Sequence, residues 1–179
     1  MDRSLSEKLK TITLLVLDVD GVLTDGKIII DDRGNESKNF NVRDGHGLRL
    51  LMRGGVDILI LTGRRSEVVQ HRANELGIKD VYQGVHDKAK VLGEILNERG
   101  LSGDSVAYMG DDIVDLPVFR IVGFSAAVAD ALDYVKEESD YVSKKKGGDG
   151  AVREICEMIL VAQGKWSEVT ERYGVKISG

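Results

Sequence analysis

Two aspartates follow an apolar run near the start of the chain, in the stretch LLVLDVDG at residues 14–21. Asp18 and Asp20 are two residues apart, so an extended backbone places both carboxylates on the same face. A buried carboxylate without a partner is energetically costly. The pair therefore needs a cation, hydrogen-bond donors or an opening to solvent.

Polar groups follow two further apolar runs in the same way, as Thr62-Gly63-Arg64 and as Gly110-Asp111-Asp112. In a parallel α/β sheet, ligands bind beyond the carboxyl ends of the strands, so these groups are expected to converge. Carboxylates this close raise one another's pKa unless a cation lies between them. Oxygen ligands without a His/Cys set favour Mg²⁺ over zinc, so the sequence predicts a magnesium site.

Apolar runs that predict strands alternate along the chain with helical patterns. Strands are predicted at residues 13–20, 56–63, 80–84, 105–112, 124–130 and 140–145, and helices at 47–55, 65–77, 88–100 and 150–164. Strands with little polar alternation are typical of a parallel sheet that is covered on both faces. The predicted fold is a doubly wound, Rossmann-like α/β sheet flanked by helices, in a single domain over residues 1–179.

The segment 26–42 interrupts this alternation. Two strand-like pieces flank a turn-forming cluster, Asp32-Arg33-Gly34-Asn35. We predict a β-hairpin inserted after the first strand, which is too short to form a cap domain. Its three adjacent isoleucines, Ile28 to Ile30, would form an apolar edge that is a liability if left uncovered.

Composition excludes several classes of protein. The formal net charge is −5, which gives no electrostatic basis for a nucleic-acid surface. No apolar run approaches the roughly 20 residues of a membrane span. The single cysteine, Cys156, cannot form an intrachain disulfide, so a cytoplasmic location is expected.

The motifs resemble those of a known superfamily. DVDGVLTDG is similar to the DxDGxxTD signature of haloacid dehalogenase-type phosphohydrolases, and Thr62 in LTGR, Lys88 in VHDKAK and GDDIVD at 110–115 follow in that superfamily's order. FNVRDGHGLRLL, YQG and GGDGAVREICEMILVAQGKW extend the resemblance to its capless 3-deoxy-D-manno-octulosonate 8-phosphate phosphatases. The resemblance implies a Mg²⁺-dependent phosphomonoesterase that works through an aspartyl-phosphate, as part of lipopolysaccharide-sugar biosynthesis.

The resemblance also implies roles for single residues. Asp18 would be the nucleophile and Asp20 the general acid and base, while Thr62 and Lys88 would hold the phosphoryl oxygens. Mg²⁺ would bind the Asp18 carboxylate, the Asp20 backbone carbonyl and Asp111, with Asp112 or Asp115 supporting these ligands from behind or through water. The residues implied to contact substrate are Asp20, Asn41, Val42, Arg43, Asp44, Gly45, Arg49, Gly63, Arg64, Arg72 and Lys88.

The missing cap leaves the predicted site open unless another subunit covers it. The resemblance implies a homotetramer, and a tail at 147–154 that reaches toward a neighbour's site. A nine-carbon (sialic or deaminated sialic acid) 9-phosphate is the alternative substrate, because no residue measures the length of the sugar. Two other classes are a catalytically silent oligomerisation domain, which would be expected to lack Asp18 or Asp20, and a receiver-like domain, in which the order of the acidic motifs differs.

Overall fold

The computed structural model describes residues 3–174, and their longest strands form one parallel sheet of six strands in the order β5-β4-β1-β6-β7-β8. The sheet strands are β1 (Leu14–Leu17), β4 (Asp57–Thr62), β5 (Asp80–Gln83), β6 (Val106–Gly110), β7 (Phe124–Ala127) and β8 (Tyr141–Val142). β1 lies between β4 and β6, and all four of its residues are buried. Burial on both faces explains its uninterrupted apolar sequence. The predicted fold class is confirmed.

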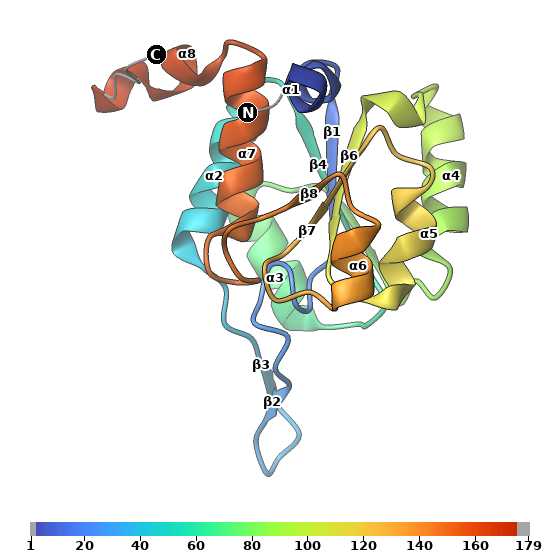
Figure 1. The fold of residues 1–179 in the computed structure, drawn as a ribbon. Helices are drawn as coiled ribbons and strands as arrows, with labels where there is room; N and C mark the ends of the chain where they lie inside the picture. Colours follow the sequence, from blue (N-terminus) through green and yellow to red (C-terminus); the bar gives the residue numbers. More distant parts are fainter. Residues whose placement is uncertain (1–2, 175–179) are drawn as a thin grey trace.

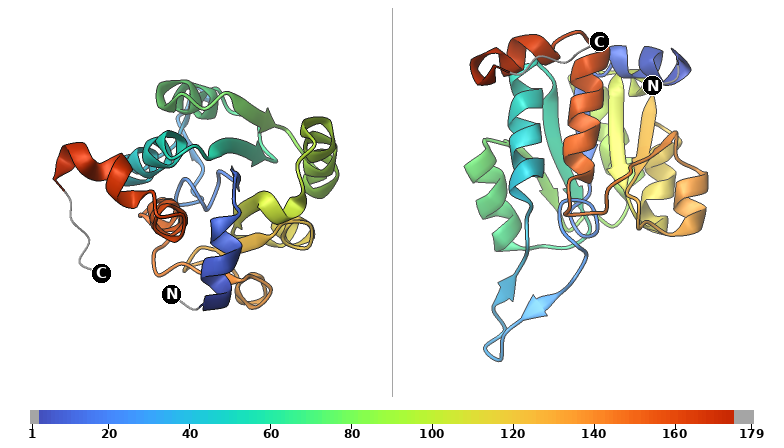
Figure 2. Two further views of the ribbon diagram at one scale, coloured as in Figure 1. Left: turned by 90° about the horizontal axis from the view of Figure 1, so that it is seen from above. Right: turned by 60° about the vertical axis from the view of Figure 1, so that its left-hand side comes forward.

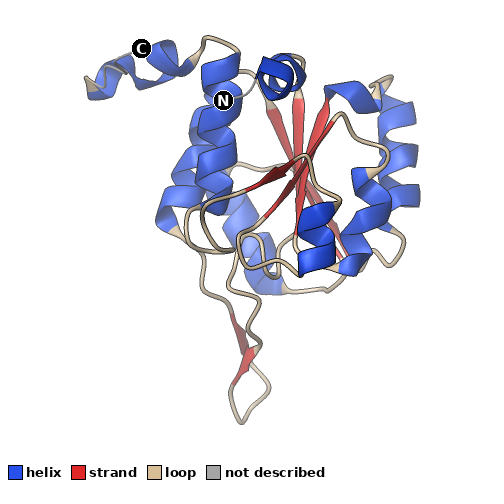
Figure 3. Ribbon diagram, in the orientation of Figure 1, coloured by secondary structure: helices blue, strands red, loops and turns tan. Residues whose placement is uncertain are grey.

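Helices cover both faces of this sheet (Figures 1 and 3). The longer helices are α2 (Val42–Arg53), α3 (Glu67–Leu76), α4 (Lys88–Arg99) and α7 (Ala151–Ala162), and the shorter ones are α1 (Arg3–Lys10), α5 (Leu116–Phe119), α6 (Asp133–Glu137) and α8 (Trp166–Thr170). α2, α3 and α7 lie on one side of the sheet and α4 and α5 on the other (Figure 2). Among the described residues, none of these helices is long and apolar enough to cross a membrane.

The boundaries differ from the sequence prediction at several elements. α2 begins at Val42, five residues before the predicted start, because the Asn41 side chain accepts a hydrogen bond from the Arg43 amide and caps the helix. The last predicted strand, 140–145, shortens to Tyr141–Val142 at the edge of the sheet. α1, α6 and α8 were not predicted, since each is short and buries only a few side chains.

The inserted hairpin projects from the edge of the sheet where the strands have their carboxyl ends (Figure 1). It pairs β2 (Ile29–Ile30) with β3 (Glu36–Ser37) in antiparallel register, which confirms the predicted hairpin with shorter strands. Ile28 and Ile30 are 61% and 58% exposed, so this chain alone leaves the predicted apolar edge open.

Candidate active site

The turn after β1 presents Asp18 at the carboxyl edge of the sheet. The Asp18 amide donates to the Met109 carbonyl of β6 at 3.1 Å, and its carboxylate Oδ1 accepts from the Val19 amide at 2.6 Å. Gly21 has a φ of +84°, and a Cβ at this position would overlap the Asp111 carboxylate. Glycine therefore lets this turn reverse tightly and lie directly against Asp111.

Lys88, the first residue of α4, reaches into the site from the opposite side. Its Nζ donates to Asp18 Oδ2 at 2.7 Å and to Asp115 Oδ1 at 2.6 Å, and the lysine is only 4% exposed. Burial alone would lower the pKa of Lys88, but the charges of Asp18 and Asp115 raise it above its ordinary value. Lys88 is therefore a permanent cation between two carboxylates.

Asp115 is fully buried, and hydrogen bonds occupy both of its oxygens. Besides Lys88, Oδ1 accepts from the Tyr108 hydroxyl at 2.6 Å, while Oδ2 accepts from the amides of Asp111 and Asp112 at 2.9 and 3.2 Å. Asp112 caps a short 3₁₀ helix, Ile113–Asp115. Asp115 thus fixes both Lys88 and the Asp111 backbone. Sequence reasoning missed Tyr108, whose one signal is a hydroxyl within an apolar strand.

Asp111 has the properties of a cation ligand. Its Oδ1 is buried and has no hydrogen-bond partner among the described residues. Carboxylate oxygens of Asp18, Asp111 and Asp115 lie within 4.8 Å of one another. Burial, aided by the neighbouring carboxylates, raises the pKa of Asp111 to about 7, and burial raises that of Asp18 to about 6. The carboxylate oxygens of Asp18 and Asp111 are the kind of ligand that Mg²⁺ prefers, so the two residues fit a magnesium site.

These groups open into one hollow of about 360 Å³. It is lined by the predicted site residues Asp18, Asp20, Thr62, Gly63, Arg64, Lys88, Asp111 and Asp112, together with Gly26, Val85, His86 and Val114. The structure thus brings together the four residues predicted to be catalytic. Thr62, at the end of β4, is only 2% exposed.

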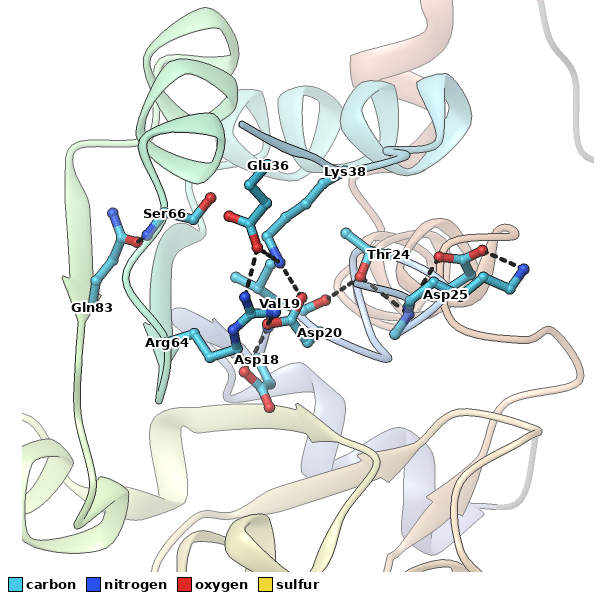
Figure 4. A network of polar contacts seen from close by, with 12 residues as sticks. Asp18, Val19, Asp20, Thr24, Asp25, Glu36, Lys38, Arg64, Ser66 and Gln83 are labelled. Atoms are coloured by element: carbon cyan, nitrogen blue, oxygen red, sulfur yellow. Dashed lines mark hydrogen bonds and ion pairs between the residues drawn. The ribbon is translucent and has the colours of Figure 1, made fainter. Parts of the chain in front are cut away.

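Asp20 has a second set of charged neighbours that the sequence did not indicate (Figure 4). Lys38 Nζ forms an ion pair with Asp20 Oδ1, and Arg64 Nη1 lies 3.9 Å from Asp20 Oδ2. Glu36, in β3, contacts both of these cations. Lys38 and Glu36 were not predicted as site residues, because a hairpin inserted after the first strand is expected to be exposed.

Nine of the eleven predicted substrate contacts divide between two hollows. Val42, Arg43, Gly45, Arg49 and Arg72 line another hollow, of about 560 Å³, in which Arg153 lies as well. None of these residues lines the hollow that holds Asp18. Within the described chain, the two sets of predicted contacts therefore do not share one cavity.

Asp44 and Asn41 are engaged with the glycine-rich segment before α7. Asp44 is 1% exposed, and its carboxylate accepts from the amides of Gly150 and Arg153 at 3.1 and 2.7 Å, so it caps α7. Asn41 Nδ2 donates to the Gly148 carbonyl, and the Gly148 amide donates to the Val22 carbonyl. The Asp44 carboxylate thus faces neither hollow, and this part of the predicted tail packs on its own chain.

The chain is similar to known proteins in both sequence and structure. A family model described as haloacid dehalogenase-like hydrolase matches residues 78–155. The chain is 45% identical over 161 residues to the 3-deoxy-D-manno-octulosonate 8-phosphate phosphatase KdsC of Escherichia coli (strain K12), covering 90% of this chain and 86% of that protein. The same-named protein of Yersinia pestis is 46% identical over 164 residues, covering 92% and 88%.

Two solved structures of phosphatases with this name also resemble the chain in fold. A 3-deoxy-D-manno-octulosonate 8-phosphate phosphatase from Moraxella catarrhalis, in complex with magnesium ion, phosphate ion and KDO, superposes with a TM-score of 0.94 at 40% identity, over 97% of this chain and 99% of that one. The structure of the phosphatase from Yersinia pestis has a TM-score of 0.90 at 45% identity, over 92% and 89%.

Proposed function

The chain belongs to the 3-deoxy-D-manno-octulosonate 8-phosphate phosphatases of the haloacid dehalogenase superfamily, and on this basis we propose how its residues perform that reaction. It is a Mg²⁺-dependent phosphatase that hydrolyses the 8-phosphate ester to the free sugar acid and phosphate. The nine-carbon alternative is not favoured, because the relatives above are named for the eight-carbon substrate. A catalytically silent oligomerisation domain and a receiver-like domain are not favoured either, because the relatives are named as phosphatases.

Asp18 is the proposed nucleophile. Its Oδ1 is held by the Val19 amide and its Oδ2 by Lys88, so the carboxylate is fixed at the floor of the hollow. An oxygen of Asp18 attacks phosphorus, the bond to the sugar oxygen breaks, and an aspartyl-phosphate results. Lys88 and Thr62 line the same hollow and would stabilise the charge on the phosphoryl oxygens.

Asp20 is the proposed acid and base. It lines the hollow beside Asp18, where it can donate a proton to the departing sugar oxygen and then accept one from the water that hydrolyses the aspartyl-phosphate. Asp18, the Asp20 backbone carbonyl and Asp111 would hold Mg²⁺, with Asp112 and Asp115 behind them. The bound ion supplies positive charge that offsets the clustered carboxylates and the phosphate.

The observation that carries this proposal is the meeting of Asp18, Asp20, Thr62, Lys88 and Asp111 in one hollow. The test measures phosphate release with Mg²⁺ from the eight-carbon ulosonate phosphate, a nine-carbon ulosonate 9-phosphate and a generic sugar phosphate. We expect a strong preference for the first, and EDTA should abolish it. Faster turnover of the nine-carbon ester would keep the mechanism and reject the substrate, and no turnover of any ester would reject both.

Binding of Mg²⁺ is expected to weaken as the pH falls from 8 to 6. The pKa of Asp111 is about 7 in the metal-free protein, so below that value a proton must leave before the carboxylate can bind the ion. Each pH unit below 7 should therefore weaken apparent affinity by up to about tenfold. Calorimetric titration at pH 6, 7 and 8 measures this, with proton release confirmed in buffers of different ionisation enthalpy. An affinity that is constant over this range would contradict Asp111 as a ligand.

We also propose a homotetramer in which the Arg49/Arg72 hollow serves a neighbour's active site. Two observations support it: the predicted substrate contacts occupy separate hollows in one chain, and the hairpin exposes Ile28 and Ile30. The substrate carboxylate would bind these arginines, whose planar guanidinium groups match its geometry. Light scattering should give a mass near four times 19.6 kDa, and a monomeric mass with full activity would reject the arrangement.

We place the enzyme in the cytoplasm. Cys156 is a buried free thiol within the core, packed in α7, as suits a reducing compartment. Fractionation of cells that express the protein tests the location.

A further inference from the structure

The hairpin carries a lysine whose surroundings are unusual for an exposed insertion. Lys38 follows β3 directly, yet its side chain is only 1% exposed. Its Nζ forms an ion pair with Asp20 Oδ1 and lies 3.5 Å from Glu36 Oε1. A lysine ammonium is seldom buried unless it is paired, and here the pairing holds the Lys38 ammonium against the Asp20 carboxylate.

Glu36 connects Lys38 to a second cation on the other side of Asp20. Arg64 Nη2 donates to Glu36 Oε1 at 2.7 Å, and Arg64 Nη1 lies 3.9 Å from Asp20 Oδ2. Two carboxylates and two cations therefore alternate in a ring that joins the hairpin to the end of β4 (Figure 4). Each oxygen of Asp20 faces one cation, which restricts rotation of its carboxyl group.

We propose that Lys38 is a positioning residue for Asp20, and that the hairpin acts in catalysis by carrying it. The inference rests on the proposed role of Asp20 as acid and base. Both proton transfers require the Asp20 carboxyl to face the reacting oxygen, and a misplacement of about 1 Å can cost about 100-fold in rate. A buried ion pair contributes little net stability compared with apolar packing, so stability alone gives a weak reason for it.

The position of Lys38 makes its proposed effect specific. Lys38 contacts Asp20 and Glu36 but does not line the hollow that holds Asp18, so it should leave substrate binding and the nucleophile unchanged. Lys38→Met is expected to lower kcat for the octulosonate phosphate about 10- to 100-fold, with KM within about threefold of the wild type. Lys38→Arg, which keeps a cation, should restore most of kcat.

An activated substrate separates positioning from a general loss of structure. The 4-nitrophenolate ion leaves without a proton, so with 4-nitrophenyl phosphate the first step does not need Asp20, whereas the attack of water still does. Lys38→Met should release one equivalent of nitrophenolate rapidly and then turn over slowly. Lys27→Met is the matched control, because Lys27 lies on the same insertion, its side chain is 74% exposed, and within residues 3–174 it pairs only with Asp25. It should behave as the wild type does.

A double-mutant cycle completes the test. Lys38→Met should cause no further loss when Asp20 is already asparagine, since its effect passes through that residue. An unchanged kcat, a rise in KM alone, or an equal additional loss in the Asp20→Asn background would overturn the proposal. If Lys38→Met does not fold, Lys38→Gln is measured by the same criteria.

The assay also distinguishes failure of the proposed function. If the wild type hydrolyses 4-nitrophenyl phosphate but not the octulosonate phosphate, the proposed substrate fails while the aryl ester still tests Lys38. If Asp20→Asn retains wild-type kcat with both esters, the acid–base assignment fails, and the inference on Lys38 fails with it.

Discussion

Replacing Asp18 with asparagine is expected to reduce phosphate release by about 10⁴-fold or more, because an amide oxygen cannot form the aspartyl-phosphate. The fold should persist. In the metal-free protein, burial raises the pKa of Asp18 from 3.8 to about 6, so at pH 7 its ionised form is more costly in the folded state than in the unfolded chain. A neutral amide removes that penalty, and the melting temperature should not fall.

Asp32→Asn is the matched control for this variant. Asp32 is an exposed aspartate in the turn of the hairpin, outside both the DxDGxxTD signature and the hollow that holds Asp18. Phosphate release and thermal unfolding should match those of the wild type. Substantial activity in Asp18→Asn would show that another group is the nucleophile, and a collapse of its fold would show that the Asp18–Lys88 pair is needed for stability.

Replacing Lys88 with methionine is expected to impair activity and stability together. The change leaves Asp18 and Asp115 buried without the cation that lies 2.7 and 2.6 Å from their oxygens. Breaking a buried ion pair on one side costs about 3–5 kcal/mol. Loss of the lysine charge that stabilises the phosphoryl oxygens should lower kcat by about 10³-fold.

The stability loss in Lys88→Met should depend on pH. Without the cation, the pKa of Asp18 rises further above its unfolded value, so the ionised form destabilises the fold above that pKa and protonation removes the penalty below it. The difference in unfolding free energy from the wild type should therefore be largest near pH 8 and smaller near pH 5. Urea denaturation in EDTA at both pH values measures it.

Lys90→Met, two residues further along and on the exposed side of α4, is the control for Lys88→Met and should change neither property. A second variant, Lys88→Met with Asp115→Asn, also removes the buried charge of Asp115. It should regain part of the lost stability at pH 8. A stability loss that is the same at pH 5 and pH 8 would contradict the electrostatic explanation.

The sequence alone determined which residues meet at the edge of the sheet. Asp18, Thr62 and Asp111 each follow an apolar run, and uninterrupted apolar runs alternating with helical patterns lead to a parallel sheet whose carboxyl ends lie together. This local pattern also placed the hairpin between Gly26 and Val42. It could not place helix starts or short edge strands, because capping by Asn41 and pairing at a sheet edge depend on single contacts.

Only the tertiary structure decided which partner each charge takes. The hydrogen bonds from Lys88 to Asp18 and Asp115 span 70 and 27 residues, and the ion pair between Lys38 and Asp20 links the hairpin to the turn after β1. Asp44, which looked free to contact substrate, is instead buried as the cap of α7, more than 100 residues away. Such pairings depend on distance and burial in the folded chain, and neither quantity can be read from residue type and spacing.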